Sequence, residues 1–184
     1  LLIFTVVLGV GYPLLITGIG QLALPAQANG SLVRSDGAVV GSALIGQSFT
    51  DADGNALPEW FQSRPSAAGA GYDGGASSGS NYGPENPDLI SAIQDRKSAI
   101  ESLDSVTASE IPADALTASG SGLDPHISPA YALLQVPRVA EARGIPEAQV
   151  RALVEAFIQG RDLGYLGEPT VNVLQLNIAL AKLG

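Results

Sequence analysis

The sequence predicts an α+β protein, in which a single N-terminal transmembrane helix is followed by one helix-rich extracytoplasmic domain with a few short strands. Three observations support this fold class. Residues 1–24 contain no charged side chain, apolar residues recur at helical spacing in the C-terminal half, and two short β-prone runs flank Ser35–Gly37. The chain therefore divides into a transmembrane anchor (1–24), a membrane-proximal connection (25–37) and one domain (38–184).

The anchor is long enough to cross a bilayer. As a helix, residues 1–24 would span roughly 36 Å, against a hydrocarbon core of about 30 Å. Pro13 removes one backbone hydrogen bond and should bend the helix, which transmembrane helices tolerate. Gly11 and Gly18 share a face that could pack closely on a partner helix. A signal peptide is the alternative because Ala26–Ala28 fits a cleavage pattern, but the apolar run exceeds the usual core of about 7–15 residues.

The composition argues against several functions. The chain has no cysteine, which excludes disulfides, zinc–thiolate sites and thiol catalysis. Its net charge is −9 and no basic stripe is present, so it is not expected to bind nucleic acid. The first charged residue is Arg34, and no Lys/Arg cluster flanks the apolar run. Because an acidic domain is easily translocated, we expect the domain to lie outside the cytoplasm.

The segments that follow the anchor predict short strands and loops. A hairpin is expected over 31–40, where a Ser-Asp-Gly turn separates two β-prone runs. Residues 41–49 predict a strand or buried extended chain, and a loop follows. Residues 58–65 are expected to be extended, with Trp60 and Phe61 partly buried.

A Gly/Ser-rich run covers residues 63–87. A flexible linker is the usual structure for such a composition. Tyr72, Asp73 and Tyr82 recur within the run, however, and favour an ordered loop.

Two helices are predicted from their caps. Asn86 can cap a helix that begins with a proline and runs to about Leu103. Ser128 can cap another, which should end before Gly144. Pro137 lies inside this second helix and should kink or split it.

Two further helices are predicted from apolar periodicity. Residues 146–160 place apolar side chains three and four positions apart, which is typical of an amphipathic helix. Residues 170–183 are mostly apolar but too short to span a bilayer, so they should form a core helix.

An internal repeat links two Gly-rich segments. Residues 66–77 and 117–128 align without gaps as G-x-G-x-D-x-x-x-S. The alignment places Asp73 and Asp124 in equivalent turns, where they could form a cation-attracting pair of carboxylates. The favoured interpretation is two tight turns, in which glycine supplies positive φ and aspartate bonds its own backbone.

Two catalytic or binding motifs occur only in part and are not expected to function. A Ser/His/Asp hydrolase would use Ser121 or Ser128 with His126 and Asp124, but no G-x-S-x-G turn is present and such close neighbours seldom have triad geometry. His126 is instead expected to bond within its own loop. The G-x-G-x-x-G run at 69–74 lacks the strand-then-helix context of a phosphate loop.

The remaining polar patterns predict structural roles. The run 51–55 begins like a calcium loop, but Ala56 stands where the loop needs a glycine for its turn and Gln62 stands where a bidentate glutamate ligand should be, so a turn is expected. Four arginines lie beside turns or helix ends, where structural roles are expected: Arg64, Arg138, Arg143 and Arg161. Of these, Arg138 and Arg143 are expected to bond the carbonyl end of their helix or nearby carboxylates.

Three runs carry a resemblance to a known family: "FQSRPSAAGAGYDGGASSGSNYGPENP", "TASGSGLDPHISPAYALLQVPRVAEARGI" and "GRDLGYLGEPTVNVLQLNIALAKL". They cover nearly everything beyond residue 60, and "SGSGLDPHISP" is the most specific part. Together with the single N-terminal anchor, they make the chain similar to the C subunits of the Kdp potassium-transporting P-type ATPase. Residues 25–58 are the least diagnostic.

The resemblance implies a non-catalytic accessory subunit of a high-affinity, ATP-driven potassium uptake pump. In that family the C subunit is needed for assembly and is described as a catalytic chaperone that raises the ATP affinity of the ATPase subunit. The chain has no D-K-T-G phosphorylation motif, which agrees with an accessory role. A direct ATP-binding subunit that forms a ternary complex with the ATPase subunit is the alternative.

The resemblance also implies partners and a location. The expected partners are a channel-like potassium-binding subunit (KdpA type), a P-type ATPase subunit (KdpB type), a small single-helix subunit (KdpF type) and the lipid bilayer. No cofactor is expected on this chain, and ATP, Mg and K would be handled by the other subunits. The chain should pass once through the bacterial plasma (inner) membrane, with its domain docked on the channel-like subunit near the potassium entrance.

No catalytic or metal-binding residue is expected in this chain. The resemblance assigns a docking or structural role to the residues of the family-motif loops, which are Ser63, Arg64, Pro65, Gly71, Asp73, Ser80, Asn81, Gly122, Asp124, Pro125, His126 and Ser128.

Overall fold

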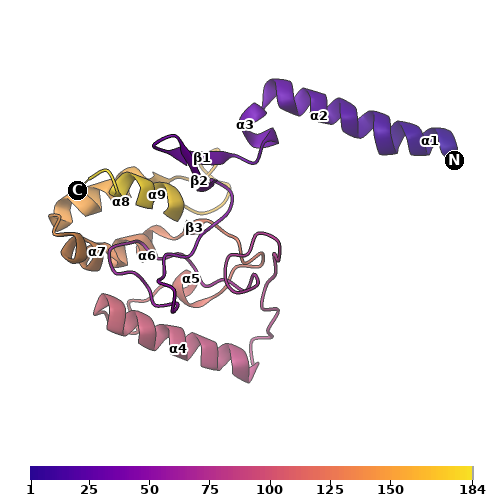
Figure 1. Cartoon of the computed structure of the whole chain (residues 1–184). Helices are drawn as coiled ribbons and strands as arrows, with labels where there is room; N and C mark the ends of the chain where they lie inside the picture. Colours follow the sequence, from indigo (N-terminus) through magenta and orange to yellow (C-terminus); the bar gives the residue numbers. More distant parts are fainter. Residues whose placement is uncertain (184) are drawn as a thin grey trace. The chain divides into compact units, whose positions relative to one another are not determined.

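The computed structural model describes residues 1–183 (Figure 1). The chain forms two compact units, Leu1–Leu44 and a second unit that begins at Ile45. A hairpin whose two strands pair with each other belongs to the first unit. The division into an anchor (1–24), a connection (25–37) and one domain (38–184) stays a prediction. The α+β class is confirmed by helices and a few short strands.

The first unit begins with the predicted apolar helix. Its parts are α1 (Leu2–Val6), a π-helical turn η1 (Val7–Gly11) and α2 (Tyr12–Ala23), with a short α3 (Pro25–Ala28) after it. Pro13 has no N–H to donate, so the regular α-helical hydrogen bonding is interrupted near it. The π-helical turn η1 is wider than an α-helical turn, and in it the Tyr12 N–H donates to the carbonyl of Val7, five residues earlier. The helix over Leu2–Ala23 is long and apolar enough to cross a membrane, and its side chains are not buried.

The predicted hairpin is confirmed in the first unit. It consists of β1 (Leu32–Ser35) and β2 (Ala38–Ser42), which pair antiparallel. Asp36 and Gly37 both have positive φ, 49° and 83°, as a two-residue hairpin turn requires. The strand or extended chain predicted over 41–49 is a strand only as far as Ser42.

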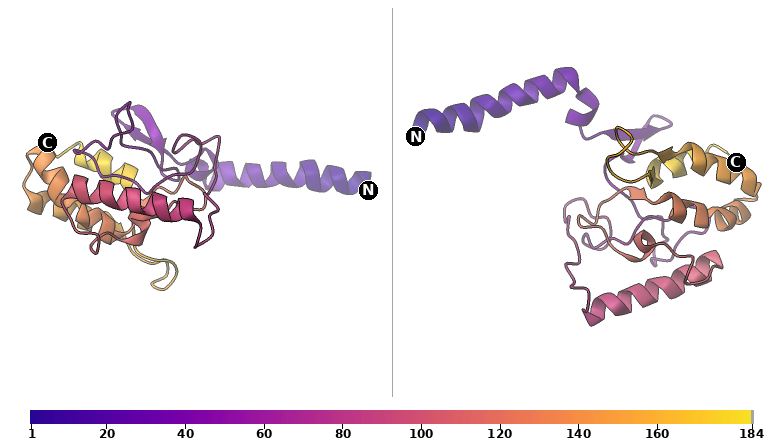
Figure 2. Two further views of the ribbon diagram at one scale, coloured as in Figure 1. Left: turned by 90° about the horizontal axis from the view of Figure 1, so that it is seen from below. Right: turned by 180° about the vertical axis from the view of Figure 1, so that it is seen from behind.

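The second unit is built from helices packed on a small sheet. Its elements are α4 (Pro87–Asp104), α5 (Ala113–Leu116), β3 (His126–Ile127), α6 (Pro129–Leu134), α7 (Val136–Arg143), α8 (Glu147–Ala156), β4 (Ile158–Gln159), β5 (Thr170–Asn172) and α9 (Val173–Leu180). Within this unit α4 lies on one side of α6 and α7, and α8 and α9 lie on the other (Figures 1 and 2). The core between these layers includes Phe61, Ile100, Ile127, Tyr131, Val136, Val139, Val150, Val154, Val171, Val173, Leu176 and Leu180.

Both predicted caps are confirmed. Asn86 Oδ1 accepts the Asp88 N–H at the start of α4, and Ser128 Oγ accepts the Tyr131 N–H at the start of α6. The second predicted helix is split between α6 and α7, as a proline at position 137 predicts. It ends at Gly144, which adopts the left-handed conformation at φ 65°.

The two helices predicted from periodicity are partly wrong. The helix predicted over 146–160 ends at Ala156, and the one predicted over 170–183 begins only at Val173. Their missing ends are β4 and β5, which pair antiparallel, and β3 pairs with the other edge of β5. Strand pairing buries Val171 completely at the centre of this sheet, a gain that helical periodicity within one segment cannot reveal.

The segment 58–65 was expected to be extended, but it begins with a turn over residues 58–60, where the Trp60 N–H donates to the Leu57 carbonyl. The residues that follow are held by one amide side chain on α9 and one at the junction of α6 and α7. Asn177 on α9 accepts the Phe61 N–H and donates to the Phe61 carbonyl, at 3.0 and 2.9 Å. Gln135 makes the same pair of bonds with the backbone of Gln62. These bonds satisfy backbone groups that leave water, so Phe61 is fully buried, whereas Trp60 is half-buried as predicted.

Arg138 links this segment to two helices. Its Nε donates to Asp104 Oδ1 at 2.7 Å, and its Nη2 donates to the side chain of Gln135. Nη1 donates to the carbonyls of Pro58 and Trp60. The predicted pairing with a carboxylate is confirmed, and this ion pair is buried.

Candidate functional site

The two segments that share the G-x-G-x-D-x-x-x-S pattern lie against each other. Ser66 Oγ donates to the Gly122 carbonyl at 2.6 Å, and the Ser78 N–H donates to the Ser121 carbonyl at 2.9 Å. The Gly/Ser-rich run is therefore anchored to a distant part of the chain, which agrees with an ordered loop and not with a flexible linker.

The equivalent aspartates form the same kind of turn. Asp73 Oδ1 accepts the Gly75 N–H, and Asp124 Oδ1 accepts the His126 N–H, each two residues further on. This agrees with the turn interpretation of the repeat. Asp73 is exposed, and Asp124 takes Arg64 as its ion-pair partner. A cation-attracting role for the two carboxylates stays a prediction.

Asp124 lies between two basic side chains. Arg64 Nη1 is 3.0 Å from Asp124 Oδ2, and His126 Nδ1 is 3.4 Å from Asp124 Oδ1. Partial burial would raise the pKa of Asp124, but the hydrogen bonds from His126 and the charge of Arg64 outweigh it and leave the pKa below its usual value. The expectation that His126 bonds within its own loop is confirmed.

Asp124→Asn should change the acid side of the stability curve. The lowered pKa means that Asp124 contributes stabilisation above pH about 4, which is lost as the pH falls through the folded-state pKa. At pH 7 the variant should lose about 1–3 kcal/mol of unfolding free energy, because Arg64 loses its carboxylate. The difference between the variant and the parent should shrink as the pH falls below about 4, and the two should converge once the pH is below the folded-state pKa of Asp124. Urea unfolding across pH measures this.

Asp73→Asn is the matched control, since it stands at the equivalent repeat position but is exposed. It should leave the curve nearly unchanged. An Asp124→Asn variant whose deficit stays constant down to pH 2 would contradict the assigned pair.

Tyr72 closes the turn over the backbone of the Arg64 segment. Its hydroxyl donates to the Arg64 carbonyl at 2.7 Å, and its N–H donates to Ser66 Oγ at 2.8 Å. Burial raises the pKa of Tyr72 to about 12, so the phenol stays neutral at physiological pH. Tyr72 adopts positive φ, 56°, which the surrounding bonds hold in place.

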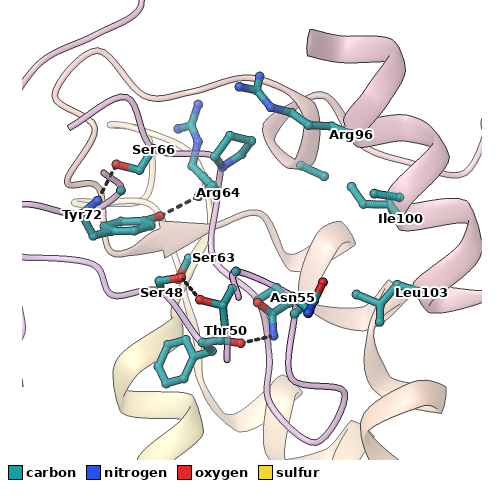
Figure 3. Close-up of a pocket in the computed structure, with 18 of the residues that line it drawn as sticks. Ser48, Thr50, Asn55, Ser63, Arg64, Ser66, Tyr72, Arg96, Ile100 and Leu103 are labelled. Carbon is teal, nitrogen blue, oxygen red and sulfur yellow. Dashed lines mark hydrogen bonds between the residues drawn. The ribbon is translucent and has the colours of Figure 1, made fainter. Parts of the chain in front are cut away.

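A cavity of about 840 Å³ lies beside this turn (Figure 3). Arg96, Ile100 and Leu103 face it from α4, and Ser63 and Arg64 face it from the extended segment. Arg96 Nη1 donates to the Leu116 carbonyl at 2.8 Å. The cavity thus combines two guanidinium groups with hydroxyl and apolar side chains.

The chemistry of the cavity suits a neutral or anionic group. Among the described residues that line it there is no aspartate or glutamate, so nothing there offers a carboxylate to potassium or magnesium. Arg64 Nε is buried and has no hydrogen-bond partner among the described residues. Likewise, no group of three or more His, Asp or Glu side chains that could hold a metal occurs within residues 1–183.

The other predicted site residues are divided between the cavity, the turns and the surface. Pro65 and Gly71 line the cavity. Ser80 and Asn81 are exposed, and Asn81 Nδ2 donates to the Gly79 carbonyl. The carbonyl of buried Pro125 accepts the N–H of the first residue of α9. Ser63 Oγ donates to the carbonyl of Gln47, and Gly122 supports the contact between the two Gly-rich segments.

The serines of the hydrolase alternative are used elsewhere. Ser128 Oγ donates to Asp114 Oδ1 at 2.9 Å while it caps α6. Ser121 Oγ accepts the Leu123 N–H. In the part of the chain that the structure describes, neither hydroxyl is hydrogen-bonded to His126, so the geometry of a Ser/His/Asp triad is not present.

Sequence reasoning did not identify three features of this region. Asp104 accepts a hydrogen bond from Arg138, and Asp114 accepts one from the Ser128 N–H. Arg96, on α4, lines the cavity. The only signal in the sequence was the presence of these charged residues next to apolar ones. Their partners depend on how distant segments pack.

Comparison with known proteins gives one consistent result. Residues 1–182 match the family model "KdpC: K+-transporting ATPase, c chain". A "Potassium-transporting ATPase KdpC subunit" of Caulobacter vibrioides is 58% identical over 179 residues, which cover 97% of this chain and 87% of the relative. The proteins of that name from Kineococcus radiotolerans and Methylococcus capsulatus are 53% identical over 180 residues and 52% identical over 184 residues. These matches cover 98% and 100% of this chain, and 88% and 94% of the relatives.

Proposed function

The chain belongs to the KdpC family of potassium-transporting ATPase subunits, and from this premise we propose that it is a non-catalytic accessory subunit that docks outside the cytoplasm on the channel-like subunit of the pump. The observation that carries the proposal is the use of the polar residues of the Gly-rich segments. Arg64, Asp124 and His126 bond one another and the backbone, which builds a rigid surface instead of a reactive group.

The apolar helix supports a place within the membrane part of the pump. Leu2–Ala23 carries no charge, and a Cβ built on Gly18 would meet no atom within 4 Å. A close helix–helix contact could therefore form at this side. The partners we propose are the channel-like KdpA type, the ATPase KdpB type and the single-helix KdpF type of subunit, in the bacterial plasma membrane.

We assign ATP, magnesium and potassium to the other subunits. A domain outside the cytoplasm cannot touch ATP bound in the cytoplasm, so any effect of this chain on ATP affinity must pass through helices as a coupling free energy between two states of the pump. The acidic character of the chain, net charge −9, would also oppose binding of the ATP anion. We propose that a catalytic chaperone role would consist of this coupling, by which the chain raises the ATP affinity of the ATPase subunit from a distance.

Removal of the chain from the purified pump is the direct test. Without it, we expect the ATP concentration at half-maximal ATPase activity to rise by about 5–150-fold, the usual range of allosteric coupling. ATPase activity is measured against ATP and potassium concentration with and without the chain, and purified chain is added back as the control. An unchanged ATP dependence in an intact complex would contradict the chaperone role.

A second readout tests the site of coupling. The isolated chain is exposed to an azido-ATP analogue, and labelled peptides are identified. Labelling of the cavity beside Arg64 and Arg96 that unmodified ATP competes away would support the direct ATP-binding alternative and overturn coupling at a distance.

A further inference from the structure

A short loop of the second unit presents apolar side chains to solvent. It connects β4 to β5 and covers residues 161–168, all of which are exposed. Leu163 is 81% exposed, Tyr165 68% and Leu166 50%. Three large apolar side chains gathered on one loop differ from the single exposed apolar residues that every protein surface carries.

The backbone of this loop is closed on itself. The Asp162 N–H donates to the Leu166 carbonyl and the Leu166 N–H donates to the Asp162 carbonyl, both at 2.9 Å. The Gly164 N–H donates to the Arg161 carbonyl at 3.1 Å, and Arg161 pairs with Glu168 at the base of the loop. The loop can therefore leave water without stranding these backbone groups.

Leu163 gives a second sign that the loop is shaped for contact. It adopts positive φ, 53°, a conformation in which a leucine is strained. The side chain gains no burial in return, because it is the most exposed large apolar side chain of the second unit among the described residues. Backbone strain that is not offset by burial within the fold is typical of functional sites.

We propose that the loop 161–168 is the docking element of this domain, and that it inserts into an apolar recess of the channel-like subunit. This inference rests on the proposed function, which it deepens by naming the contact residues. The loop is preorganised by its own bonds, so it would lose little conformational entropy on binding a recess of fixed shape.

The charge of the chain favours a protein over the bilayer surface as the occupant. The net charge of −9 falls entirely on the second unit, since Arg34 and Asp36 of the first unit cancel. An acidic domain is repelled by anionic headgroups. The one basic residue of the loop, Arg161, is already paired with Glu168, whereas surface elements that bind anionic lipid present unpaired Lys or Arg.

The test uses variants that remove the apolar tip and keep the fold. Leu163→Gly removes the side chain and the strain together, since glycine adopts positive φ freely. Combined with Tyr165→Ser, it should weaken binding of the full-length chain to the complex of the other pump subunits by about 10–100-fold, the effect of losing one to two interface anchors. Ile90→Ser on α4, an apolar residue 46% exposed, is the control and should bind like the parent.

The outcomes separate this inference from the proposed function. Parent and double variant binding equally would overturn the docking role of the loop and leave the accessory role intact. Failure of the parent chain to bind the other subunits would instead overturn the proposed function.

A single label distinguishes the two possible occupants. The chain has no cysteine, so Leu166→Cys gives one site for an environment-sensitive fluorophore. In nanodiscs that contain phosphatidylglycerol, the labelled chain alone should show a water-exposed spectrum, and a shift to an apolar spectrum should follow addition of the other subunits. A shift in the chain alone would show that the loop enters the bilayer, and would overturn the protein recess.

Discussion

Arg138→Met is expected to lower the free energy of unfolding by about 3–5 kcal/mol, the usual cost of removing one partner of a buried ion pair. Asp104 and Arg138 side chains are only 1% and 6% exposed. Burial raises the pKa of Asp104, and Arg138 opposes this effect by stabilising the carboxylate. Without Arg138 the carboxylate would stay buried with no counter-charge, and the carbonyls of Pro58 and Trp60 would lose their donor. Urea unfolding of the full-length chain, followed by far-UV circular dichroism, measures the loss.

The pH dependence of this variant checks the cause. A carboxyl whose folded-state pKa is raised favours the folded state as the pH falls through that pKa, because the folded state then binds the proton first. The deficit of Arg138→Met should therefore shrink as Asp104 becomes protonated. Replacing both partners, Arg138→Met with Asp104→Leu, should recover much of the loss, since an apolar pair leaves no buried charge.

Arg151→Met is the matched control. Arg151 also pairs with a carboxylate, Glu147 at 2.9 Å, but both side chains are exposed. Its removal should cost no more than about 0.5 kcal/mol. Equal losses of unfolding free energy for the two arginine variants would contradict a larger contribution of the buried Arg138–Asp104 pair.

Gly122→Ala is expected to cost about 2–5 kcal/mol. A Cβ at this position would lie 2.6 Å from the Ser78 carbonyl oxygen and 2.7 Å from the Ala68 nitrogen, both backbone atoms that cannot rotate away. Overpacking of this kind costs about 1–3 kcal/mol. The φ of Gly122, +67°, adds about 1–2 kcal/mol for a residue that carries a Cβ.

The same substitution at a nearby glycine, Gly120, shows whether the loss comes from the steric clash at Gly122 or from replacing any glycine of this segment. A Cβ on Gly120 would meet no atom within 4 Å, and its φ is not positive, so Gly120→Ala should change stability by less than about 1 kcal/mol. Thermal unfolding of the two variants side by side gives the comparison. If both glycines tolerate alanine equally, the two Gly-rich segments do not pack as closely as described.

The segments that the sequence predicted well are those governed by local rules. Asn86 and Ser128 cap helices because a side-chain oxygen bonds an N–H two or three residues away. The Asp36–Gly37 turn forms because both residues tolerate positive φ. The aspartates at 73 and 124 follow the same logic, since each bonds the N–H two residues on. Such interactions are complete within a few residues, so a short window of sequence contains both partners.

Prediction failed where the partner lies far away in the chain. Thr170–Asn172 stand at the start of a mostly apolar run that predicts a helix, yet they form the central strand because two other short segments supply the pairing groups on either side. The candidate site shows the same limit: the sequence identified Arg64 but gave no sign that Arg96 lines the same cavity.

The sequence by itself determined the apolar helix, the caps, the turns and, through the resemblance carried by three runs, membership of the KdpC family. Only the tertiary structure decided which charges are buried as pairs, where the cavity lies, and that Leu163, Tyr165 and Leu166 stay in water. The physical reason is that burial belongs to a position in the packed fold. An apolar residue looks the same in the sequence whether its side chain is buried in the core or exposed on the surface.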